Sequence, residues 1–198
     1  QELLMAGVYD ELAKALDKLP NGFPRPPSNV AIALLKKIFS PEEASLGAQL
    51  SGSMEPAAEI AKRVGLSAEE AKTKLTKMAK RGLVWYSISR GKFSFRLAPF
   101  VVGIYEAQLE TMDHELAHLV EEYFASRGAA GIMKPQPALH RVVPANKAVK
   151  SELILPYDDV KSILSNSKSF GLRDCVCRVQ QKHLGHECTF PLTTCLFF

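Results

Sequence analysis

The segment that decides the fold spans residues 56–97 and reads PAAEIAKRVGLSAEEAKTKLTKMAKRGLVWYSISRGKFSFRL. Apolar residues at helical spacing predict a short amphipathic helix over 56–64, which a glycine ends. Ser67 followed by Glu70 has the spacing of a capping box, in which each residue satisfies a backbone N–H of the other. The pattern therefore predicts a second helix over 68–81, separated from the first by a tight turn.

A β-hairpin is predicted directly after these two helices. The runs 84–88 and 92–97 are rich in β-branched and aromatic residues, and the Ser-Arg-Gly of 89–91 between them is typical of a turn. Helix, turn, helix and hairpin in this order, with the segment 59–66 as its most characteristic part, resembles the winged helix-turn-helix family. The resemblance covers roughly residues 30–97 and implies a three-helix module with a β wing.

The remainder of the chain divides around this module. A long helix from about Gly103 to Ser126 and a further helix over 157–165 are predicted from apolar spacing. The expected fold class is mainly α with a small β wing (α+β). The expected regions are an N-terminal helix and Pro-rich connector at 1–29, the winged-helix module at 30–100, a long helix and linker at 101–131, and a mostly irregular cysteine-containing domain at 132–198.

Composition favours a cytoplasmic globular protein. Of 198 residues, 46% are hydrophobic and 23% charged, which is ordinary for such a domain, and no apolar run approaches the length of a membrane span. The N-terminal residues lack the features of a secretory signal peptide. Because the chain begins at Gln1 without an initiator methionine and ends in an apolar tetrapeptide, we expect a piece of a longer polypeptide.

The four cysteines lie within the last 24 residues, at Cys175, Cys177, Cys188 and Cys195. Clustered thiols without a secretory signal more often bind metal than form disulfides. Thiolates suit iron–sulfur clusters, zinc and copper. Cys175 and Cys177 can reach one centre only if the backbone bends between them. Iron and zinc both stay open as the occupant at this point, and a disulfide is the third possibility.

Nearby residues affect this choice. His183 and His186 lie between the cysteines, so a zinc site with four thiolates or with three thiolates and one imidazole is conceivable. The spacing lacks the paired C-x2-C knuckles of most zinc sites, which favours a cluster. Arg173, Arg178 and Lys182 would offset the negative charge of a thiolate-ligated centre.

The cysteine segment also carries a family resemblance. Cys175-Val176-Cys177-Arg178, with Cys188, Pro191 and the terminal 195–198, resembles cytosolic 4Fe-4S (ferredoxin-type) proteins of anaerobic bacteria and archaea that begin with a winged-helix region. The stretches 22–24, 40–44 and 99–106 fit the same group. The resemblance implies a [4Fe-4S] cluster on the four cysteines and a redox partner protein. The ferredoxin-type repeats of that group are absent, consistent with truncation.

The helix-turn-helix segment is basic. Residues 56–96 contain ten basic and three acidic residues, a net charge of +7, whereas the remaining residues sum to −3. Lys74, Lys77 and Arg81 share one face of the second helix, and Arg90 and Lys92 lie at the tip of the wing. This arrangement suits phosphates along a duplex, but also the docking of a protein partner. DNA is therefore a possible partner, and a membrane is not expected.

The segment 114–118, His-Glu-Leu-Ala-His, matches the H-E-x-x-H pattern of zinc proteases. We expect a false match, because the apolar stripe of this helix must face the core and leaves both histidines on a solvated face. The stripe consists of Leu109, Met112, Leu116, Leu119, Val120 and Tyr123.

The sequence therefore predicts an iron–sulfur electron-transfer protein or subunit without catalytic activity of its own. Two alternatives stay open: a transcriptional regulator whose cluster senses redox state, and a zinc-stabilised winged-helix protein that binds DNA.

Overall fold

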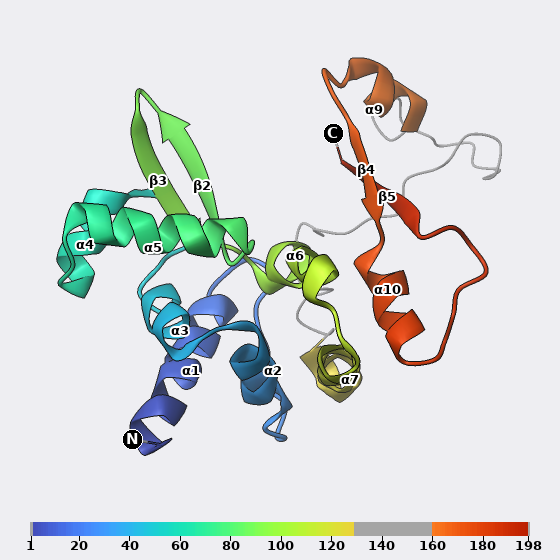
Figure 1. Cartoon of the computed structure of the whole chain (residues 1–198), viewed down its shortest axis with the longest axis horizontal. Helices are drawn as coiled ribbons and strands as arrows, with labels where there is room; N and C mark the ends of the chain where they lie inside the picture. Colours follow the sequence, from blue (N-terminus) through green and yellow to red (C-terminus); the bar gives the residue numbers. More distant parts are fainter. Residues whose placement is uncertain (1, 129–159, 198) are drawn as a thin grey trace.

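The computed structural model describes residues 2–128 and 160–197, a mixed α and β chain with small antiparallel sheets (Figure 1). Three helices precede the central segment that begins at Glu55. Ser40 and Glu43 form the reciprocal hydrogen bonds of a capping box at the third helix, with proline at its first position. The bounds are α1 (Glu2–Asp17), α2 (Val30–Ile38) and α3 (Pro41–Gly47).

The central segment has the predicted order of helix, turn, helix and hairpin. Ser67 and Glu70 cap the second helix as expected, and Gly65 ends the first in a left-handed conformation with φ of 70°. A short strand pairs antiparallel with the second hairpin strand, so the sheet order is β1-β3-β2. The elements are β1 (Glu55–Pro56), α4 (Ala57–Val64), α5 (Ala68–Lys80), β2 (Val84–Ser89) and β3 (Lys92–Leu97).

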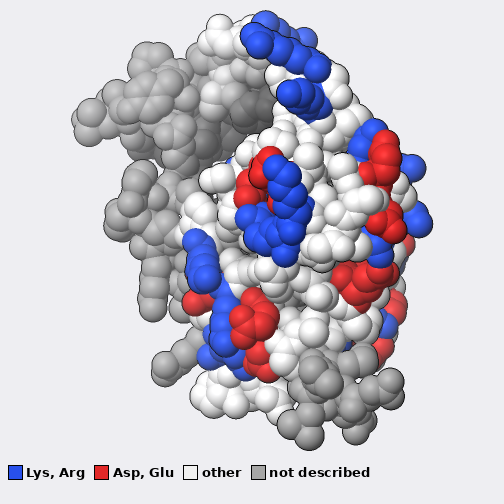
Figure 2. All heavy atoms as spheres, turned by 90° about the vertical axis from the view of Figure 1, so that its left-hand side faces the viewer, with Lys and Arg blue, Asp and Glu red and all other residues white. Residues whose placement is uncertain are grey.

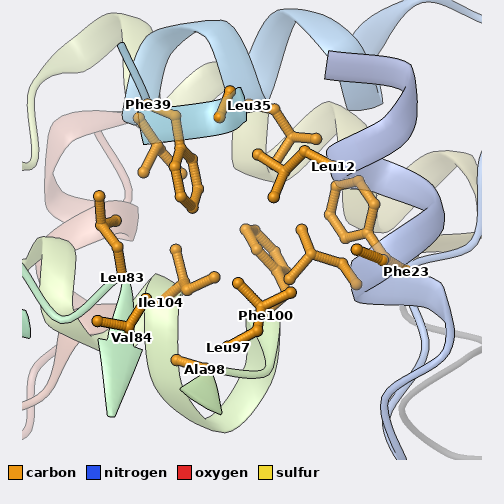
Figure 3. Close-up of a cluster of buried hydrophobic side chains, with 14 of the residues drawn as sticks. Leu12, Phe23, Leu35, Phe39, Leu83, Val84, Leu97, Ala98, Phe100 and Ile104 are labelled. Atoms are coloured by element: carbon orange, nitrogen blue, oxygen red, sulfur yellow. The ribbon is translucent and has the colours of Figure 1, made fainter. Parts of the chain in front are cut away.

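The hydrophobic core lies where the N-terminal helices meet the base of the hairpin. Figure 3 shows side chains from α1, α2, both hairpin strands and the following turn pointing toward one another. They include Leu12, Phe23, Leu35, Phe39, Leu83, Val84, Leu97, Ala98, Phe100 and Ile104, all of them buried. Phe23 stacks on Tyr123 with ring centroids 4.9 Å apart. The aromatic contact fixes the helix that carries Tyr123 against the N-terminal connector.

The single helix predicted from Gly103 to Ser126 is wrong. The chain instead forms short helical turns, α6 (Tyr105–Ala107) and η2 (Gln108–Thr111), and then α7 (His114–Tyr123). Met112 and Asp113 between them are extended, and the Asp113 carboxylate accepts a hydrogen bond of 2.7 Å from the Leu116 N–H. An aspartate in this position caps a new helix better than it continues an old one. Apolar spacing runs across the break and conceals it.

The described part of the C-terminal region is more regular than predicted. It contains α9 (Val160–Asn166), β4 (Gly171–Asp174), α10 (Val176–His183) and β5 (Thr193–Phe197), with β4 and β5 paired antiparallel. The helical part of the expected helical/irregular domain is present in these residues, whereas the pair of strands was not predicted. The irregular stretch predicted at 132–156, and the start of the helix predicted at 157–165, lie outside the described residues.

The cysteine-containing region attaches to the rest of the molecule through α10, which packs against α7 and η2 (Figure 1). Among residues 163–197, Val176 and Gln180 are the buried side chains, and both belong to α10. Within the described ranges, the structure contains no helix that combines the length and the apolar character needed to cross a bilayer.

Candidate functional site

Three of the four predicted ligands come together where β4 passes into α10. Cys175 is the residue before α10, Cys177 lies in its first turn, and Cys195 lies in β5 opposite Arg173 of β4. The Cys175 thiol interacts with the thiols of both Cys177 and Cys195. All of the cysteines are free thiols. The described structure therefore places the Cys175 thiol, at a helix start, beside one thiol of the same helix and one thiol of a neighbouring strand.

The backbone bends between the first two cysteines, as their Cys-x-Cys spacing requires for a shared centre. Cys175 is extended, with φ of −79° and ψ of 115°, and its N–H donates to the Leu192 carbonyl at 2.9 Å. Its own carbonyl then accepts from the N–H of Arg178 and Val179, which starts the helix. Val176 between the two cysteines is 3% exposed. Val176 is thus buried between two cysteines that are more exposed, and it anchors this bend in the core.

The start of α10 stabilises a thiolate at Cys175. Burial raises the pKa of this thiol, but the nearby N–H groups of Arg178 and Cys177 and the thiols of Cys195 and Cys177 outweigh it, so the pKa lies below its ordinary value. The sulfur makes no capping hydrogen bond of regular geometry. Proximity of N–H groups at a helix start nevertheless favours the anionic form, which is the form that binds metal.

A chain of hydrogen bonds connects the thiols to residues 2–128, called the N-terminal part below. The Tyr105 hydroxyl lies against the Cys177 thiol and donates to Gln180 Oε1 at 2.5 Å. Gln180 Nε2 donates to Glu121 Oε2 of α7 at 2.9 Å, and Gln181 Nε2 donates to the same oxygen at 3.0 Å. Tyr105 and Gln180 are each 3% exposed. Burial and the neighbouring Cys177 raise the pKa of Tyr105, so its hydroxyl stays a donor.

Cys188 does not join the other three thiols. It lies in the loop between α10 and β5 and makes no hydrogen bond with any described residue. Neither nearby histidine replaces it: His186 Nδ1 lies 3.3 Å from Gln181 Oε1, and His183 lies near Asp113. Within the described ranges, no three side chains of His, Cys, Asp and Glu are arranged to hold a metal ion. The metal role of the four cysteines stays a prediction.

The basic residues around the thiols all have partners. Arg178 donates to the Pro191 carbonyl and lies over the Phe190 ring. Arg173 pairs with Glu110 at 3.7 Å, and Lys182 with Glu187 at 3.4 Å. Arg178 thereby holds the end of the loop that carries Cys188, so its role includes positioning this loop as well as contributing charge.

The basic face of α5 is partly neutralised. Lys74 pairs with Glu42 and Arg81 with Glu43, both carboxylates belonging to α3. Figure 2 shows acidic and basic side chains interspersed on the side that carries α4 and α5, not a continuous basic surface. Lys77 and the wing residues Arg90 and Lys92 form no ion pair with described residues. The structure therefore leaves fewer cations available than the sequence predicted.

The H-E-x-x-H segment forms the first turns of α7. His114 and His118 are exposed, and Glu115 pairs with Lys37 at 2.5 Å. The predicted apolar stripe does face the core, with Leu116, Val120 and other members of the stripe buried. Glu115 therefore points to a lysine of α2 and not toward a metal-bound water.

No family model, curated protein or solved structure matches this chain.

Sequence reasoning missed three residues around the thiols: Tyr105, Gln180 and Glu121. Gln180 offers one signal that could have been read: it lies three residues after Cys177, which places the two side chains on neighbouring positions of one helical face.

Proposed function

We propose that this chain is an iron–sulfur electron-transfer protein in which Cys175, Cys177, Cys188 and Cys195 ligate a [4Fe-4S] cluster. The observation that carries the proposal is the contact of the Cys175 thiol with both Cys177 and Cys195 at the start of α10. Four cysteine thiolates are the usual ligand set of such a cluster, which supplies one-electron chemistry when it is bound.

The proposal requires the loop over 184–192 to bring Cys188 to the other three thiols. Gly185 is in the left-handed conformation, with φ of 80°, and reverses the chain after α10. Beyond it the loop is held on both sides of Cys188: His186 and Glu187 contact Gln181 and Lys182 of α10, and Arg178 reaches the Pro191 carbonyl and the Phe190 ring. Because Cys188 has no hydrogen bond to lose, its approach to the other thiols sacrifices no described polar contact at that residue.

We also infer that residues 30–100, which include β1, α4, α5 and the β2–β3 hairpin, form a winged helix-turn-helix module that serves as a docking surface. The order of elements and the pairing of β1 with β3 support this assignment. A groove of about 470 Å³ between α5 and the hairpin is lined by Lys80, Tyr86, Ile88 and Phe93 among others. Tyr86 and Ile88 are 56% and 54% exposed.

This combination of apolar and basic side chains favours a protein partner over DNA. Readout of bases requires donors and acceptors along the recognition helix, and phosphate binding requires unpaired cations. On α5, Lys74 and Arg81 are paired with α3 carboxylates. An acidic redox partner, in the cytoplasm, would meet Lys80, Arg90 and Lys92 around the exposed Tyr86 and Ile88.

A structural zinc ion is the second candidate, and the separation of Cys188 favours it. Three thiolates with one further ligand complete a tetrahedral zinc site, whereas the cluster takes four thiolates. Zinc would leave the chain without a redox role.

The deciding experiment is metal and sulfide analysis of the full chain purified without oxygen. We expect about four irons with matching acid-labile sulfide per chain, and a broad visible band that bleaches on reduction. Cys175→Ser, Cys177→Ser, Cys188→Ser and Cys195→Ser should each lose iron, whereas the matched loop variant Thr189→Ser should retain it. One zinc per chain and no colour would refute electron transfer, and retention of iron in Cys188→Ser would remove that residue from the ligand set.

A further inference from the structure

A second pair of potential metal ligands lies on α7, away from the thiol group. His114 and His118 are one helical turn apart, and both are exposed. We propose that these two imidazoles chelate one divalent transition-metal ion of the zinc or nickel type, with water completing its coordination. The proposal does not depend on the cluster and would stand if the thiols held no metal.

The distance between the two nitrogens fits a chelate. His114 Nε2 and His118 Nε2 are 3.2 Å apart. An ion at a zinc–nitrogen distance of about 2.05 Å from both would then subtend an angle of roughly 100° between them, close to the tetrahedral value. The ring centroids are only 4.4 Å apart and the planes are inclined at 65°. The rings therefore pack edge to face with their Nε2 atoms close together.

Three of the neighbouring carboxylates have other partners. Glu115 pairs with Lys37 at 2.5 Å, and Asp113 caps α7 while it pairs with the same lysine. Glu121 accepts hydrogen bonds from the two glutamines of α10. Within the described part of the chain no group of three ligands exists, so two imidazoles are the protein's contribution. This leaves an open and accessible site, without the positioned glutamate that a zinc hydrolase needs.

A metal ion bound at this site would stabilise α7, the helix against which α10 of the cysteine region packs. A chelated ion cross-links positions one turn apart and so favours the helical over the unfolded form of α7. The same helix packs against α2, and its Glu121 holds α10. The ion would therefore raise the melting temperature of the full chain as well as bind to its surface.

The test is a Zn²⁺ and Ni²⁺ titration of the full chain under reducing, chelator-free conditions, followed by calorimetry and by ¹⁵N shifts of the imidazoles. We expect one site that depends on both histidines, and an affinity there at least about tenfold weaker in His118→Gln. The variant His118→Gln with Glu122→His keeps the number of histidines on α7 but places the two imidazoles eight residues, about 12 Å, apart along the helix, and should not restore the site.

The thiols also bind these ions, so the number of sites must be compared between variants. His183→Gln and His186→Gln should retain the α7 site, and wild type should exceed His118→Gln by one ion per chain. Equal stoichiometry and affinity in wild type and His118→Gln would overturn the proposal. So would zinc-induced shifts confined to His183 or His186, or restoration of the site by the eight-residue spacing.

Discussion

The contact between Tyr105 and Gln180 gives the most direct prediction about how the cysteine region is held. Tyr105→Phe removes only the hydroxyl, which donates to Gln180 Oε1 at 2.5 Å between residues that are each 3% exposed. The amide oxygen then stays buried without its donor, while Gln180 Nε2 still reaches Glu121. Leaving one buried polar group unsatisfied costs about 1–3 kcal/mol.

We expect Tyr105→Phe to lower the stability of the whole chain and also to loosen α10 locally. The free energy of unfolding from urea titration should fall by about 1–3 kcal/mol in Tyr105→Phe. Amide exchange in α10 should accelerate more than tenfold if about 1.4 kcal/mol or more of its local opening free energy is lost. The matched control is Tyr9→Phe, because the Tyr9 hydroxyl donates to the Phe39 carbonyl at 3.0 Å, also in the interior. This control should destabilise the chain without a selective effect on α10.

Two results would refute the reasoning. A change below about 0.5 kcal/mol, within the usual range for surface substitutions, would mean that the hydroxyl contributes nothing to the fold. Equal acceleration of α10 exchange in Tyr105→Phe and Tyr9→Phe would mean that the hydrogen bond does not specifically join α10 to the N-terminal part. Gln181→Ala provides a further check, because its amide reaches the same carboxylate from an exposed position and should have little effect.

Two further predictions concern the N-terminal part. Gly82→Ala should lower the free energy of unfolding by about 2–5 kcal/mol, because a φ of 69° strains a non-glycine residue and the new Cβ would lie 2.1 Å from the Ala107 Cβ. The control is Gly91→Ala, where φ is 74° but the space around the new Cβ is open. It should cost only about 1–2 kcal/mol in the same urea titration. Burial raises the pKa of Glu43, but its hydrogen bonds to Arg81 and Ser40 outweigh this, so the pKa is lowered. The stabilisation by the ionised carboxylate is therefore present above the unfolded-state pKa of about 4.3 and is lost as pH falls through the lower folded-state pKa. Glu43→Gln should accordingly lower the free energy of unfolding by about 1 kcal/mol at pH 7 and by almost nothing near pH 2. An equal cost at both pH values would contradict this.

Local signals predicted the elements of the N-terminal part well. Ser67 and Glu70 form the capping box that their spacing indicates, and the hairpin follows where the β-rich runs lie. Such features depend on neighbours in sequence, and the residues themselves determine them. The break before α7 was missed because a capping aspartate, Asp113, interrupts an apolar repeat that continues on both sides. The choice between continuing and restarting a helix rests on one side-chain hydrogen bond.

The candidate site was predictable only in part, because some of its contacts join residues that are far apart in the sequence. Cys175 and Cys177 are close in sequence, so their proximity follows from one bend of the backbone. Cys195 reaches them through the β4–β5 pairing, which places it opposite Arg173. No local pattern specifies that register. Tyr105 and Gln180 are 75 residues apart, and their contact depends on how α10 packs against η2 and α7.

The way the cysteine region is attached bears on how a metal would act there. Among residues 163–197 its one buried apolar side chain is Val176, beside which Val179 and Leu184 pack partly buried, so little apolar surface holds it to residues 2–128. Much of that attachment is polar and passes through Tyr105 and Glu121. A region with so small a core gains stability mainly from bonds that cross-link it, and the metal–thiolate bonds that we propose would link α10 to β5. The N-terminal part thus fixes one side of the thiol group, and the bound metal would fix the other.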